Sequence, residues 1–309
     1  MAEQQLAQGQ TMAGKWAGLG GVRGRIHNSP LAIKALLVGM PDTGKSTLLQ
    51  GCPEMFLLNL DRFSTTNPDP QATSWPVWDQ QTGHVLGDDG KPTILTFEMV
   101  EKKVEQLIKL ALENKPRPTL VGIDTLTALL RLVREHIVTH AVEIGLSSVA
   151  VDEWPKLNGL SAYDWAYNRI VRIISDLSNA GYGVYGVTHL ANDVVQIGED
   201  RSKVVPTLVF TAGFWKRLFD IFELIVVLER RRGERTESVL NTITLPDGKV
   251  LQQPGSKTVR FDEVWMVTAR AEFGDGITKR KLNLPDIKLP LKGGWEEFIT
   301  QYKAAQANS

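Results

Sequence analysis

One short segment restricts the fold of this chain more than any other feature. Residues 39–46 read G-M-P-D-T-G-K-S and fit the pattern G-x-x-x-x-G-K-[ST], which average composition would produce by chance about 0.01 times in a chain of this length. An almost entirely apolar strand is predicted before it, over Leu31–Val38, and a short helix to about Cys52 after it. This order of strand, glycine-rich loop and helix is the context of a P-loop, so the segment is predicted to hold phosphates. The residues predicted to bind the nucleotide are Gly39, Met40, Pro41, Asp42, Thr43, Gly44, Lys45, Ser46 and Thr47.

The chemistry of this loop predicts a nucleoside triphosphate ligand, with ATP and Mg²⁺ as the expected cofactors. The glycines let backbone N–H groups curl around phosphate oxygens, and the start of the helix adds positive potential. Lys45 is expected to reach the β and γ phosphates, and the Ser46 hydroxyl to bind Mg²⁺. The alternative is a glycine turn between strand and helix, but the full motif in its context favours phosphate binding.

Two acidic residues follow strands that are predicted to be buried. Asp124 ends the strand Leu120–Ile123 and has the form of a Walker B acid, which would hold Mg²⁺. Asp61 ends the strand Met55–Leu60, where a carboxylate could orient and deprotonate the attacking water. The alternatives are a helix N-cap for Asp124 and a turn residue for Asp61. With a P-loop in the same chain, the catalytic interpretation is favoured for both.

Two further residues are candidates for the same reaction. His189 ends the strand Val184–Thr188 and is interpreted either as a sensor of the γ-phosphate or as a structural histidine. Arg270 follows Val267 on a late strand and is interpreted either as an arginine supplied to a neighbouring subunit or as a solvated strand residue. The rivals to Arg270 are Lys279, Arg280 and Lys281.

Strands alternate with helices along the chain, which predicts an α/β fold with a mainly parallel central sheet flanked by helices. Residues 1–30 are interpreted as a flexible tail, 31–309 as one domain, and 62–95 as an insertion within it. Three helices are also predicted: one that begins at Phe97, one that ends at about His140, and one from Ser161 to about Gly181. The other predicted elements are a loop over 191–216, a strand over 221–228, hairpins over 242–251 and 259–284, and a terminal helix from Trp295.

The bulk composition restricts the class of protein. Lysine plus arginine equals aspartate plus glutamate at 35 each, so a strongly basic nucleic-acid binder is not indicated, although a local basic patch is compatible. The single cysteine, Cys52, excludes an internal disulfide and fits a reducing cytosol. No apolar run approaches the length needed to span a bilayer. A cytoplasmic location is therefore expected.

Two clusters of basic residues are candidates for nucleic-acid contact. The first runs from Arg201 and Lys203 to Arg217 and is interleaved with Phe210, Phe214 and Trp215, which suits single strands through phosphate contact and base stacking. The second comprises Arg230, Arg231, Arg232 and Arg235. From the residues alone, ordinary surface with Phe214 and Trp215 in the core is the favoured alternative for both.

The order of these motifs resembles that of the RecA-like ATPases. In that family a P-loop is followed by a strand ending in a catalytic acid, the Walker B strand, a first DNA loop, a polar sensor and a second DNA loop. These places match 39–47, Asp61, Asp124, about 143–160, His189 and about 191–216 of this chain. A closer likeness is to phage nucleotide-binding proteins related to phage single-strand-annealing recombinases. It is carried by Tyr163-Asp-Trp165, Val187-Thr-His189, and Arg270 followed by Phe273-Gly-Asp275, and covers roughly 31–300.

The resemblance implies a DNA-dependent ATPase that binds single-stranded DNA as a homo-oligomer, with Arg201 and Lys203 in the DNA-binding segment. If the chain is phage-encoded, its location would be the cytoplasm of the bacterial host. The chain departs from the family at Asp61, where glutamate is usual, at His189, where glutamine is frequent, and at Thr268, where relatives often have lysine. Two other functions are compatible with a P-loop: a nucleotide-switched regulator or assembly factor without DNA binding, and a P-loop kinase with 230–235 as an arginine-rich lid.

Overall fold

The computed structural model describes residues 31–62, 69–79, 81–87, 89–145, 160–196, 202–208, 210, 212–244, 250–267, 284–290 and 294–307. The predicted tail over 1–30 and most of the first predicted DNA loop fall outside these ranges. Within them, no helix has both the length and the apolar character required to cross a membrane.

The described residues form a central sheet of nine strands with β1 near its middle. β1 pairs in parallel with β7 on one side and with β9 on the other, and the parallel pairing continues from β7 through β6 and β2 to β3. Beyond β9, strands β10 and β11 pair antiparallel. The predicted α/β fold with a mainly parallel sheet is confirmed. From edge to edge the strands are β3 (Thr73–Trp75), β2 (Met55–Asn59), β6 (Leu120–Asp124), β7 (Gly183–Gln196), β1 (Lys34–Gly39), β9 (Leu224–Thr244), β10 (Val250–Val267) and β11 (Ile287–Leu289), and β8 (Ser202–Leu208) pairs with β7.

Helices cover both faces of the sheet. The face that carries Leu36 and Val38 packs against the larger group of helices, and the face that carries Ala35 and Leu37 packs against the other two. Side chains of β1 are buried on both faces, which explains why its sequence is almost continuously apolar. The larger group comprises α3 (Phe97–Leu112), α4 (Leu126–His140), α5 (Leu160–Asn179) and α6 (Ala212–Ile221), and the smaller α2 (Lys45–Gln50) and α7 (Trp295–Ala307).

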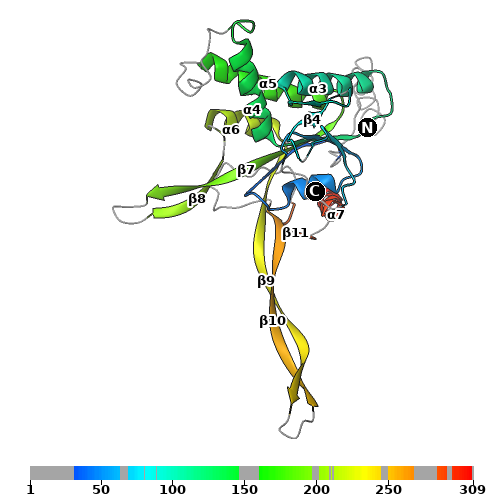
Figure 1. Ribbon diagram of the computed structural model, residues 1–309, viewed down its shortest axis with the longest axis vertical. Coiled ribbons are helices and arrows are strands. Elements are labelled where there is room, and N and C mark those ends of the chain that lie inside the picture. Colours follow the sequence, from blue (N-terminus) through cyan, green and yellow to red (C-terminus); the bar gives the residue numbers. More distant parts are fainter. Residues whose placement is uncertain are drawn as a thin grey trace, which may run out of the picture.

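Two antiparallel ribbons project from this body (Figure 1). In the first, β7 continues past the sheet and pairs with β8 from Leu190↔Leu208 to Gln196↔Ser202. In the second, β9 and β10 pair continuously from Val227↔Val267 to Thr244↔Val250. The turn of the hairpin predicted over 242–251 falls between these two strands, although the residues of that turn lie outside the described ranges.

The first ribbon overturns the prediction of a loop over 191–216. That segment contains the end of β7, the whole of β8 and the start of α6. A two-stranded ribbon is formed by main-chain pairing and does not require the apolar alternation of a half-buried strand, so the pattern gave little signal. The strand predicted over 221–228 is also much longer than expected, because β9 runs on to Thr244.

The segment predicted as an insertion is partly integrated into the domain. β3 joins the edge of the central sheet, and β4 (Val85–Leu86) pairs with β5 (Pro92–Thr93). Val85 is fully buried in the core, and Trp78 donates a hydrogen bond from Nε1 to the carbonyl oxygen of Asn59 at 2.8 Å. The described part of the insertion therefore packs against the sheet.

Candidate nucleotide-binding site

A pocket of about 580 Å³ opens at the carboxyl ends of the parallel strands. This volume is within the usual range for small-molecule sites. The sheet register explains why its residues meet, since Gly39 at the end of β1 lies opposite His189 on β7, and Asn59 at the end of β2 lies opposite Asp124 on β6. The lining residues are Pro41, Asp42, Thr43, Gly44, Lys45, Ser46, Thr47, Asp61, Thr125, His189 and Arg230.

Two glycines of the predicted P-loop are required by its backbone. Gly44 has φ +88°, in the left-handed region that a side chain disfavours. A Cβ on Gly39 would lie 2.5 Å from the carbonyl oxygen of Leu228 and 2.7 Å from Oγ1 of Thr43. The loop can follow this path around a ligand only with glycine at both ends, as the motif predicts.

Lys45 is buried against the loop that precedes it. Its Nζ donates to the carbonyl oxygens of Gly39 and Met40 at 2.9 and 2.5 Å, and to Oγ1 of Thr43 at 3.2 Å. Burial lowers the Lys45 pKa to about 8, and the negative charges of Asp124 and Asp42 offset part of this effect. The ammonium group therefore lies among the residues that line the pocket, and without bound phosphate its pKa is close to physiological pH.

The alternative interpretation of Asp124 as a helix cap does not hold. The N-cap of α4 is Thr125, whose side chain accepts a hydrogen bond from the backbone N–H of Ala128 at 3.0 Å. Asp124 itself is fully buried beside the pocket, and its charge acts on Lys45. Its carboxylate and the Ser46 hydroxyl are hard oxygen donors of the kind that Mg²⁺ prefers. These two residues fit the predicted metal site.

Asp61 is fixed at the pocket by the main chain around Asp124. The backbone N–H groups of Leu60 and Asp61 donate to the carbonyl oxygen of Asp124, at 2.7 and 3.2 Å. This connects the chain leaving β2 to the end of β6. Asp61 thereby lines the pocket together with the P-loop, as a residue that activates water would have to.

His189 enters the pocket from β7 as a neutral side chain. Burial lowers its pKa, and the charge of Lys45 lowers it further, against the opposing effects of Asp61 and Asp42. Its buried Nδ1 makes no hydrogen bond to any residue within the described ranges. A neutral imidazole with an uncommitted nitrogen can accept or donate a hydrogen bond when a ligand fills the pocket.

Arg230 is a pocket residue whose position the sequence analysis missed. By sequence it belongs to the basic cluster over 230–235, but in the fold it is exposed on β9 and lines the pocket beside Lys45 and Ser46. The sequence does contain part of the signal for a pocket position, because Arg230 comes only two residues after the end of the strand predicted over 221–228. The adjacent residue, Arg231, is not directed there; it pairs with Glu229 and lies 4.6 Å from the ring centroid of Trp265.

The remaining predicted site residues are not brought to the pocket by the described part of the structure. Arg270, its three rivals and Arg201 lie outside the described residues. Lys203 lies on β8, opposite Val195 of β7.

The aromatic residues proposed for base stacking are mostly core residues. Phe214 is fully buried and stacks on Tyr167, with ring centroids 4.3 Å apart, and Phe210 is also buried. Trp215 is half-buried against the same core. Arg217 is bound to Asp164 and Asn168 of α5. The alternative that placed Phe214 and Trp215 in the core is thus confirmed for Phe214, and Trp215 is only half-buried.

Comparison with known families agrees with the geometry of the pocket. A family model described as an AAA domain matches residues 31–271. The chain belongs to the AAA domain family. The matched residues include the P-loop, both acidic residues, His189 and Arg230. The match identifies this part of the chain as a P-loop ATPase domain that binds nucleotide. A comparison with curated proteins found no match.

Proposed function

We propose that this AAA domain protein hydrolyses ATP in the presence of Mg²⁺ and couples this reaction to single-stranded DNA as a homo-oligomer. The observation that carries the ATPase proposal is the convergence of Lys45, Asp61 and His189 on one pocket. Lys45 would bind the terminal phosphates, and Asp61 would accept the proton of the attacking water. When bound between Ser46 and Asp124, Mg²⁺ would neutralise charge on the phosphates.

Arg230, which also lines the pocket, would support the same reaction. Its guanidinium group presents paired N–H donors that match phosphate oxygens. It would contribute a second cation to the triphosphate beside Lys45. The pocket would then bind phosphate charge through one buried and one exposed cation.

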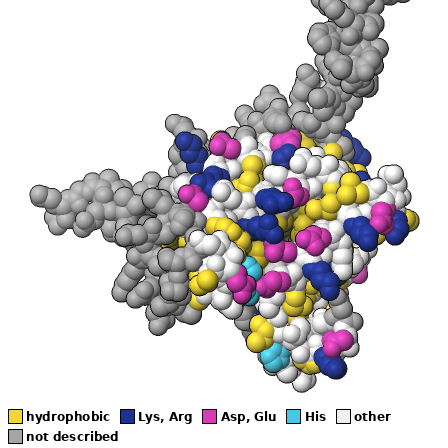
Figure 2. All heavy atoms as spheres, turned by 90° about the horizontal axis from the view of Figure 1, so that it is seen from above, with side chains coloured by type: hydrophobic (Ala, Val, Ile, Leu, Met, Phe, Trp, Pro, Cys, Tyr) yellow, Lys and Arg dark blue, Asp and Glu magenta, His cyan; other side chains and the backbone are white. Residues whose placement is uncertain are grey.

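The DNA proposal is supported by the path of β7. This strand carries His189 at the pocket and then continues to Gln196 in the ribbon with β8. Any change that the nucleotide imposes on His189 therefore acts on the strand that forms the predicted DNA segment. The face over α3, α4 and α5 is a less suitable surface for DNA, because its acidic and basic side chains are interspersed (Figure 2).

The proposal of an oligomer is supported by the ribbon of β9 and β10. A two-stranded hairpin is only marginally stable in water by itself, and this one extends away from the body of the domain (Figure 1). A neighbouring subunit would provide a surface on which the ribbon can pack. Arg270, close to the end of β10 in sequence, would then be supplied to a neighbour's nucleotide.

The test is ATP turnover with and without single-stranded oligonucleotide, together with DNA affinity by fluorescence anisotropy at several salt concentrations. Stimulated turnover and salt-dependent binding are expected, with a smaller salt slope in the double variant Arg201→Ala/Lys203→Ala. Lys109→Ala/Arg131→Ala is the matched control, because it removes two exposed cations from α3 and α4. Turnover without DNA binding under any condition would favour the regulator. Phosphate transfer only to an added acceptor would favour the kinase.

The shared site is tested by mixing two inactive variants. Lys45→Ala should lose nucleotide binding, and Arg270→Ala should bind nucleotide but hydrolyse it poorly, by up to roughly 10³–10⁵-fold. A mixture should recover activity, because some interfaces combine an intact P-loop with an intact arginine. Absence of recovery in mixtures shown to co-assemble would contradict a site shared between subunits.

A further inference from the structure

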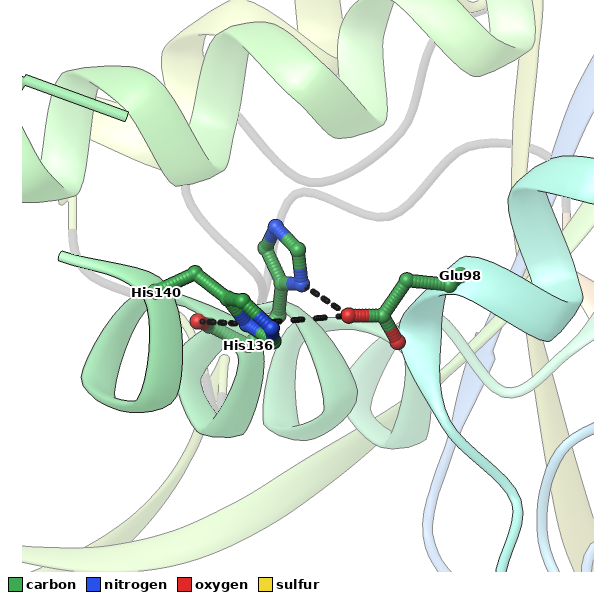
Figure 3. Close-up of side chains that lie close together, drawn as sticks. All are labelled: Glu98, His136 and His140. Atoms are coloured by element: carbon green, nitrogen blue, oxygen red, sulfur yellow. Dashed lines mark hydrogen bonds and ion pairs between the residues drawn. The ribbon is translucent and has the colours of Figure 1, made fainter. Parts of the chain in front are cut away.

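Three potential metal-binding side chains lie together on the outer helical layer, away from the P-loop. Glu98 belongs to the first turn of α3, and His136 and His140 lie one turn apart on α4 (Figure 3). One donor atom from each lies within 4.8 Å of the other two. Residues at i and i+4 share one face of a helix, so both imidazoles face the same carboxylate.

The contacts within this group centre on one carboxylate oxygen. Nδ1 of His136 lies 2.5 Å from Oε1 of Glu98, and Nδ1 of His140 lies 3.6 Å from the same oxygen. Donor atoms around a tetrahedral Zn²⁺, at bond lengths of about 2.0–2.2 Å, are roughly 3.3–3.6 Å apart. The 2.5 Å contact between His136 and Glu98 would open to about 3.3 Å around an ion, and Glu98, with 47% of its side chain exposed, has room to move.

The surroundings orient the imidazoles before any ion binds. The ring of His136 stacks on Trp165 of α5, with centroids 5.7 Å apart, and contacts Phe97 at 5.4 Å. Nδ1 of His140 lies 3.2 Å from the carbonyl oxygen of His136. An ion bound through this Nδ1 takes the nitrogen unprotonated, so binding replaces the hydrogen bond to that carbonyl oxygen and releases the proton.

We propose that Glu98, His136 and His140 form a binding site for a transition-metal ion, with Zn²⁺ as the ion of choice and water in the open position. Two imidazole nitrogens and a carboxylate oxygen suit Zn²⁺, whereas Mg²⁺ prefers oxygen donors only. His136 has 13% and His140 31% of its side chain exposed, so the site is accessible from solvent.

An ion at this site would connect α3 to α4, the helix that begins directly after Asp124. The site is separate from the nucleotide pocket, because none of its three residues lines that pocket.

The test uses the full-length protein without an affinity tag, stripped with a chelator and kept free of nucleotide and Mg²⁺. ZnCl₂ is titrated by calorimetry, and CoCl₂ is followed by the visible absorption of the bound ion. One ion per chain is expected, with a higher melting temperature. His140→Gln and Glu98→Gln should each weaken Zn²⁺ binding by at least about 10–100-fold and remove the Co²⁺ band.

His84→Gln is the matched control, because it makes the same change at an exposed histidine outside the cluster. It should bind Zn²⁺ like the wild type. His140→Gln is the main probe because the residue lies at the surface end of α4, and circular dichroism checks that each variant is folded. The proposal is overturned if the wild type binds no Zn²⁺, if His140→Gln and Glu98→Gln both bind it unchanged, or if His84→Gln loses it equally.

Discussion

Nucleotide affinity should fall as the pH rises through about 8, because Lys45 then loses its charge in the free protein. Burial lowers the Lys45 pKa from 10.5 to about 8. A bound triphosphate places negative charge beside the ammonium group and raises its pKa again. At any pH between the Lys45 pKa of the free protein and the Lys45 pKa of the complex, binding therefore takes up a proton. The affinity is fully retained only below the pKa of the free protein.

The magnitude follows from the charged fraction of the free protein. With a pKa of about 8, Lys45 is charged in about 90% of molecules at pH 7, about 50% at pH 8 and about 10% at pH 9, and the apparent dissociation constant varies inversely with this fraction. A non-hydrolysable ATP analogue with Mg²⁺ should thus bind roughly tenfold more weakly at pH 9 than at pH 7. His189 adds nothing in this range, because its lowered pKa leaves it neutral throughout.

The assay is isothermal titration calorimetry in two buffers of different ionisation enthalpy. At pH 8 the two heats should differ by the equivalent of about half a proton taken up for each nucleotide bound. Lys45→Arg is the control, since arginine remains charged at these pH values; its affinity, whatever its absolute value, should not change with pH. Equal affinity of the wild type at pH 7 and pH 9, without proton uptake, would show that the hydrogen bonds to Gly39, Met40 and Thr43 keep the amine charged despite burial.

Three substitutions test other parts of the pocket. Asp61→Asn should bind the analogue normally but hydrolyse ATP roughly 10²–10⁴-fold more slowly, because the amide cannot accept a proton; normal steady-state turnover would place the base elsewhere. Arg230→Ala should weaken nucleotide binding by about 10–100-fold, the equivalent of one charge-assisted hydrogen bond, with an unchanged melting temperature; unaltered affinity would assign Arg230 to the rim only. Gly39→Ala should destabilise the fold by roughly 1–3 kcal/mol in denaturant unfolding, because its Cβ would lie 2.5 Å from a backbone oxygen of β9; a stable variant would mean that β1 and β9 can separate at this point.

The elements that the sequence predicts well are those with strong periodicity. Phe97, Val100, Val104 and Leu107 recur at helical spacing, and all four are buried on α3. The strands before Asp61 and Asp124 were recognisable because strands buried on both faces are continuously apolar. The parallel pairing of such strands then explains why the two acidic residues lie at the same edge of the sheet.

The parts that were missed depend on contacts distant in sequence. Arg230 reaches the pocket because β9 pairs with β1, so that Leu228 lies opposite Gly39. No local pattern encodes that pairing. The sequence of the ribbon of β7 and β8 predicts a loop, because main-chain pairing of two strands leaves no apolar period in the sequence. For Phe214 and Leu218 a local signal did exist, since two apolar residues at i and i+4 predict the buried face of α6.

One strand, β9, extends from the nucleotide loop to the far end of the longer ribbon. Leu228 pairs with Gly39 at one end of this path, and Thr244 pairs with Val250 at the other. At about 3.3 Å per residue, the two ends are roughly 50 Å apart. The ribbon is in this sense a lever arm with its pivot at Leu228, beside the P-loop: a rotation of about 10° there would displace the far end by roughly 9 Å over such a length. A fluorophore near Thr244 paired with a second one on the body of the domain, for example on α5, would therefore report a small rotation at the pocket as a large change in distance.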